Sequence, residues 1–185
     1  MTIRPSTLAE LEHGLVEASR RAERLWAATD DPCVQPAGGG WSVAQCLSHL
    51  ALSTNAYLPV WRAALEAPGG VERLEAPRPL RLDAWGRVLG WFLEPPAKIR
   101  FRTKNGFEAP SSPAALEEFL ASQRELLQLV GRLEGIAIDR IQIRSAFEER
   151  VRYSIWSSLV ITLIHQRRHI WQAENAKATR AAGAP

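Results

Sequence analysis

Hydrophobic residues recur at alternating spacings of three and four positions along four long stretches of this chain. This is the period of an amphipathic helix, which turns one apolar face toward a core. The first stretch should end before Asp30-Asp31-Pro32, because proline and paired acidic residues favour a turn. The pattern therefore predicts four long helices, over residues 8–25, 43–65, 113–133 and 154–178.

Local signals mark where the second and third of these helices begin. Ser42 and Gln45 have the spacing of a capping box, in which each side chain bonds the backbone of the other residue. Pro59 lies within the same stretch and predicts a kink or a division of the helix. Ser112-Pro113 predicts a cap followed by a proline in the first turn, and Gln123 lies among the apolar positions of the helix that follows.

Two long connections separate the predicted helices. Residues 67–112 are rich in proline, glycine and arginine, with one short helix expected over 84–93 after Asp83 as its cap. Gly135 should end the third long helix. Residues 136–152 alternate isoleucine with polar side chains, and we expect an extended crossover rather than a strand, because one isolated strand has no partner.

Four amphipathic segments without a convincing set of strands predict an all-α fold, a four-helix bundle with long connections. A chain of 185 residues fits a single domain over residues 1–185. The Ala/Gly-rich tail, about residues 178–185, is expected to be frayed.

Composition narrows the class of function only slightly. The net charge is +3 with scattered carriers, which gives little support for a nucleic-acid partner. There is no apolar stretch long enough to span a membrane and no signal-peptide pattern near the start, so a cytoplasmic protein is expected. Cys33 and Cys46 are then most simply reduced thiols. The alternating cations Lys98, Arg100, Arg102 and Lys104 are either a solvated face, which we favour, or an attractive surface for a carboxylate-bearing thiol.

Three histidines carry the main indication of chemistry. His165 and His169 are four residues apart, on one face of the last predicted helix, and His49 lies on the second. Side chains from facing helices of a bundle can converge on one ion. Three neutral imidazoles leave an open coordination position and suit Zn(II), which we favour, or Ni(II) or Fe(II). A zinc peptidase would have a glutamate after the first histidine of the pair, but this chain has Gln166.

The strings WSVAQCLSHL, residues 41–50, and HQRRHIWQ, residues 165–172, resemble the DinB-like superfamily, which includes YfiT-type metal hydrolases and thiol-dependent S-transferases. The resemblance implies a four-helix bundle with an unusual order of helix directions, a three-histidine metal site and a homodimer. The positions that match the motifs of this family are Trp41, Ser42, His49, His165, His169 and Gln172.

A site of histidines alone suits the activation of a thiol, because a bound cation stabilises the thiolate without help from a protein carboxylate. The favoured hypothesis is therefore an enzyme that transfers a low-molecular-weight thiol, as cosubstrate, to an electrophile. Three alternatives stay open: a metal-dependent hydrolase of a small ester or amide, a non-catalytic metal-binding stress-response protein, and a regulator that binds nucleic acid.

Four further residues lie on or beside the two predicted helices that carry the ligands. Gln172 either orients a ligand, water or substrate, or is an ordinary core or surface glutamine. Trp41 either forms a wall of the pocket or packs at the start of the helix. Cys46 is expected to be a buried apolar thiol rather than a neighbour of the ion. Arg168 is expected to make surface pairs, turned away from the ligands.

Overall fold

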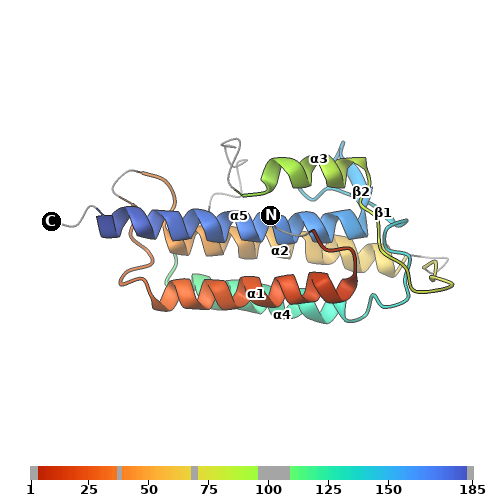
Figure 1. Ribbon diagram of the computed structural model, residues 1–185, viewed down its shortest axis with the longest axis horizontal. Helices are drawn as coiled ribbons and strands as arrows, with labels where there is room; N and C mark the ends of the chain where they lie inside the picture. Colours follow the sequence, from red (N-terminus) through yellow and green to blue (C-terminus); the bar gives the residue numbers. More distant parts are fainter. Residues whose placement is uncertain (1–3, 37–38, 68–70, 96–108, 183–185) are drawn as a thin grey trace.

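The computed structural model of the protein describes residues 4–36, 39–67, 71–95 and 109–182. Four long helices form a bundle, and a fifth, shorter helix packs on its outside (Figure 1). The prediction of an all-α fold is confirmed. The helices are α1 (Leu8–Ala27), α2 (Val43–Leu65), α3 (Ala84–Leu93), α4 (Ala115–Val130) and α5 (Ile155–Ala182).

The directions of the four long helices follow an uncommon order. Residue numbers increase in the same direction along α1 and α5: Gly14 lies beside Leu163, and Arg21 lies beside Glu174. These two neighbouring helices are therefore parallel. In Figure 1, α2 and α4 run together in the opposite direction. Parallel neighbours cannot be joined by a short turn. The long connection between α2 and α4, which contains α3, carries the chain back to the other end of the bundle.

The ring of helices runs α1, α4, α2, α5, so that α1 faces α2 and α4 faces α5 across diagonals. The core between them is built from the predicted apolar faces. Leu11, Leu15, Leu47, Phe119 and Trp156 are all completely buried. The α2 helix continues from Val43 to Leu65 through Pro59. Of the two expectations for this proline, a kink or a division of the helix, the division is wrong.

The short helix α3 lies along the outside of α5 (Figure 1). Its cap, Asp83, accepts a hydrogen bond from the Gly86 N–H at 2.8 Å and another from the Ser154 N–H at 2.6 Å. Gly86 faces Ser157 so closely that a Cβ there would lie 2.5 Å from the serine Oγ. The absence of a side chain at this position is what allows the two helices to approach.

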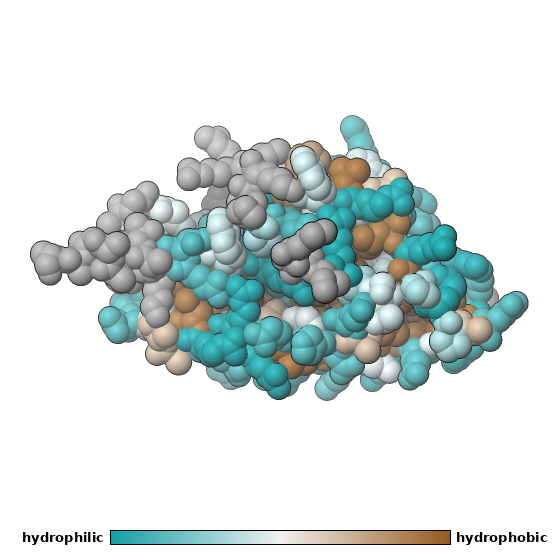
Figure 2. Space-filling view, viewed as in Figure 1, coloured by the Kyte–Doolittle hydropathy of each residue, from teal (hydrophilic) through white to brown (hydrophobic). Residues whose placement is uncertain are grey.

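The outer surface is mostly hydrophilic on the face shown in Figure 2, with apolar side chains in small groups. Three of the exposed apolar side chains, Trp85, Val88 and Trp91, lie on α3, each with about half of its surface exposed. In the described ranges, no helix combines the length and the apolar character needed to cross a membrane.

The structure differs from the predicted elements at three points. The segment expected to be an extended crossover contains a strand, β1 (Gln142–Arg144), which pairs antiparallel with β2 (Arg152–Ser154). The third long helix begins at Ala115, because the Ser112 Oγ accepts a hydrogen bond from the Ala114 N–H within a turn. The same helix ends at Val130, before Gly135.

The last helix is longer than expected. It continues to Ala182, beyond the predicted end near residue 178, and residues 183–185 lie outside the described part. The four cations predicted between Lys98 and Lys104 also lie outside the described residues.

Candidate metal centre

The start of α2 is fixed by a complete capping box. The Ser42 Oγ accepts a hydrogen bond from the Gln45 N–H at 3.1 Å, and the Gln45 Oε1 accepts one from the Ser42 N–H at 3.0 Å. Because this cap sets the first turn, it also sets which face each later residue occupies. Trp41 lies just before the helix and His49 two turns into it, on the side toward α5.

His165 and His169 lie on the face of α5 that opposes α2. These two helices run antiparallel, and the histidines near the middle of α5 meet His49 in the first third of α2. Gln166 follows His165 directly but points into the core, where it is completely buried. It therefore does not occupy the position of a general base beside the histidines.

The three histidines form one compact cluster. Their ligand atoms all lie within 4.8 Å of one another. The Nε2 atoms of His49 and His165 are 3.2 Å apart, and the ring centroids of the three pairs are 4.6–5.0 Å apart. Two nitrogens bound to one tetrahedral zinc at 2.0–2.1 Å would lie about 3.3 Å from each other. The observed separation of the two Nε2 atoms is thus close to the spacing that a shared ion requires.

The electrostatic environment keeps the cluster in the neutral form that a metal needs. Burial, followed by the neighbouring His49 and Arg168, lowers the pKa of His165 to about 3. Burial also holds the pKa of His169 well below its usual value, with His165 as the next cause. Neutral imidazoles are the metal-binding form, because a protonated ring nitrogen has no lone pair to offer.

One buried nitrogen of the cluster has unused bonding capacity. The Nδ1 of His169 is buried and has no hydrogen-bond partner within the described ranges. Buried polar atoms nearly always have a partner in folded proteins. The donor set, its spacing, its neutrality and this unpaired nitrogen all fit a divalent ion held by His49, His165 and His169.

Trp41 closes one side of the cluster. Its indole stacks on His169 with ring centroids 5.4 Å apart and planes 19° from parallel, and it lies 4.9 Å from the ring of His49 at a tilt of 60°. Contact with a histidine from each helix restricts both rings at once. The position agrees with a wall of the site rather than with packing at the helix start alone.

Gln172 and Cys46 differ in their relation to the cluster. Gln172 is partly buried, and its side chain interacts with His169, which opposes part of the lowering of the histidine pKa. Cys46 is completely buried in the apolar core beside Leu47 and Phe119 and is not one of the clustered groups. Burial raises the pKa of its thiol to about 12, so it stays protonated. The expectation of a buried apolar cysteine agrees with this position.

Arg168 affects the pKa values of the histidine cluster, and the sequence pattern did not predict this. It was expected at the surface, but only 7% of it is exposed, and its guanidinium donates to the Phe92 carbonyl of α3 at 3.2 Å. The positive charge lies close enough to lower the pKa of both His165 and His169. The packing of α3 on α5, which the helical period of α5 does not encode, places Phe92 against this side chain.

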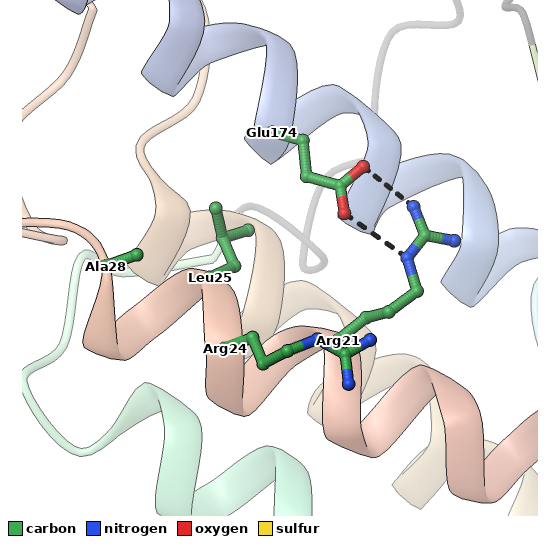
Figure 3. A pocket seen from close by; sticks show the side chains of 5 residues that line it. All are labelled: Arg21, Arg24, Leu25, Ala28 and Glu174. Atoms are coloured by element: carbon green, nitrogen blue, oxygen red, sulfur yellow. Dashed lines mark hydrogen bonds and ion pairs between the residues drawn. The ribbon is translucent and has the colours of Figure 1, made fainter.

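A separate recess of about 340 Å³ lies between α1 and α5 (Figure 3). Arg21 donates two hydrogen bonds to the Glu174 carboxylate, at 2.7 and 3.2 Å, and Arg24 pairs with Glu17. Both arginines that line this recess are therefore engaged with carboxylates of the protein. The recess contains none of the three histidines, and the histidine cluster is the better candidate for chemistry.

Comparison with known proteins agrees with the fold and the cluster. No curated protein and no solved structure matched the chain. The family model described as the DinB superfamily matches residues 11–173, which includes all three histidines and all four long helices except the first residues of α1 and the end of α5. The chain belongs to the DinB superfamily.

Proposed function

We propose that this protein is a metal-dependent enzyme that transfers a low-molecular-weight thiol to an electrophile. His49, His165 and His169 hold the ion, with Zn(II) favoured over Ni(II) or Fe(II) as for other open nitrogen sites. The observation that carries the proposal is the composition of the cluster: among the described residues it contains three imidazoles, two of them with a pKa lowered by burial, and no carboxylate.

The charge of the site decides what it can stabilise. Carboxylate ligands would cancel the charge of a divalent ion, whereas imidazoles leave it uncancelled. An ion held by three histidines would favour the thiolate form of a bound thiol at neutral pH. The surrounding residues contribute in other ways: Trp41 covers two of the rings, and burial excludes water from His169.

Hydrolysis is the less favoured chemistry, because attack by water is faster when a general base removes a proton from it. Gln166 occupies the sequence position of the peptidase glutamate, yet its amide cannot accept a proton and points into the core. A thiol needs no such base once its proton has been lost.

The ligand set is tested by metal content. Protein purified without an affinity tag should contain about one divalent metal per chain, and His165→Ala should lose most of it because two imidazoles remain. His13→Ala is the matched control, since His13 is an exposed histidine on α1 and lies outside the cluster. A full metal load in His165→Ala would refute the proposed ligands.

The reaction is tested separately with metal-loaded protein. A panel of cellular thiols is incubated with a chromogenic electrophile, and loss of free thiol is followed together with product formation. Thiol transfer should exceed that of His49→Ala, which lacks one ligand, and a circular dichroism spectrum of the variant checks that it is folded. Cleavage of small esters by the wild type, with no thiol transfer above the His49→Ala background, would replace the proposal with hydrolysis.

A further inference from the structure

Two glutamines form a reciprocal pair in the middle of the bundle. Gln123 of α4 is 1% exposed and Gln166 of α5 is completely buried. The Gln123 Nε2 donates to the Gln166 Oε1 at 3.2 Å, and the Gln166 Nε2 donates to the Gln123 Oε1 at 2.6 Å. Each amide thus satisfies the other in a region that is otherwise apolar.

The pair is also tied to a third helix. The Gln123 Nε2 lies within hydrogen-bonding distance of the Leu15 carbonyl of α1, at 3.1 Å, and of the Ser19 Oγ, at 3.2 Å. The backbone carbonyl cannot move without moving α1 itself. Since α4 and α5 face each other across a diagonal of the bundle, the amide pair connects two helices that share little other contact.

Such a connection matters because a metal site tolerates little rotation of the helix that carries its ligands. Side-chain tips lie about 5–6 Å from a helix axis, so a rotation of roughly 10° moves them by about 1 Å. Metal–ligand distances vary by only about 0.2 Å. Hydrogen bonds are directional and weaken quickly when they lose alignment, so a buried pair resists such a rotation.

Gln166 is the residue next to His165, about 100° around the axis of α5 from it, and is completely buried in the core. Fixing its amide therefore fixes the direction in which the histidines point. We propose that the Gln123–Gln166 pair is a positioning element, which holds α5 at the rotation that directs His165 and His169 toward His49. This inference rests on the proposed function, in that it takes the three histidines as the metal ligands.

The test uses Gln123→Leu, Gln166→Leu and the double variant. Each is titrated with Co(II), which reports affinity and, through its visible absorption, the geometry of coordination; unfolding in urea is measured in parallel. Each single variant should be less stable, because one buried amide loses its partner. Each should also bind Co(II) about 10- to 100-fold more weakly, as expected when a residue that orients a ligand is lost.

The double variant separates positioning from stability. Replacing both amides with apolar side chains leaves neither of them unpaired, so much of the stability should return. The Co(II) affinity should stay lowered, and the absorption should stay altered, because nothing then fixes the rotation of α5. Val130→Ala, a buried apolar substitution at the end of α4 that leaves the amide pair intact, is the control: it should lose stability and keep the wild-type absorption.

Wild-type affinity and absorption in the double variant would overturn the positioning role, even if the single variants fail to fold. A wild-type protein that does not bind Co(II) would instead overturn the proposed metal site, and the positioning role with it. The two failures are therefore distinguishable in one titration series.

Discussion

Acid should destabilise the metal-free protein through His165. Burial, followed by the charges of His49 and Arg168, lowers the pKa of this residue to about 3 in the folded state, whereas an unfolded histidine has a pKa of about 6.5. The unfolded chain therefore binds more protons between these two values. Folding stability is complete above about pH 6.5 and decreases as the pH falls toward about 3.

The size of the effect follows from the shift. One pKa unit corresponds to about 1.4 kcal/mol, so about 1.5 units below the unfolded pKa, near pH 5, an enclosed histidine loses about 2 kcal/mol. His165 keeps part of its surface exposed, and solvent screening reduces the expected loss to about 1–2 kcal/mol. His169, whose pKa is lowered as well, should add to this.

Urea unfolding with a chelator present, at about pH 7.5 and about pH 5, measures the loss directly. His165→Gln should show a smaller difference between the two pH values, because it removes the group that must stay uncharged in the fold. His13→Gln, an exposed substitution, should behave as the wild type. An equal loss in the wild type and in His165→Gln would refute the reasoning, since the acid sensitivity would then come from other groups.

Two further substitutions test how the outer helix and the loops are held. Gly86→Ala should destabilise the protein by about 1–2 kcal/mol in urea unfolding, because the new Cβ would lie 2.5 Å from the Ser157 Oγ and this crowding exceeds the gain in helix propensity; an unchanged midpoint would show that the two helices separate freely. Asp139→Asn should cost about 1–2 kcal/mol, because the buried carboxylate accepts two hydrogen bonds from Arg78 and one from the Arg81 N–H. Thermal unfolding at low and high salt would measure it, and a loss that vanishes entirely in salt would contradict the role of burial.

The helical framework could be predicted from sequence because each long helix has a periodic apolar face and several have explicit caps. The hairpin was missed for a physical reason. The stretch that contains β1 alternates in sequence, but no partner strand was recognised, because β2 is only three residues long and leads directly into α5. Likewise, Ser112 was predicted to cap a helix, but its hydroxyl accepts a hydrogen bond from the Ala114 N–H within a turn.

The candidate site was accessible to sequence reasoning to the extent that it depends on spacing along helices. The i, i+4 pair placed His165 and His169 on one face, and the bundle brought His49 to them. The surroundings of the site depend on which neighbour each face meets. Gln123 occurs at an apolar position of its helix, but nothing in the sequence identifies Gln166 as its partner, because that contact crosses the bundle.

The ligands of the proposed site are far apart in the chain, since His165 follows His49 by 116 positions. An unfolded chain would have to close a long loop to bring them together, and nothing then holds them in place. An ion bound by the triad therefore selects the folded chain: at a free concentration of about 100 times its dissociation constant it adds about 2.7 kcal/mol to stability. The lifetime of this protein against unfolding and proteolysis would then follow the metal supply of its surroundings.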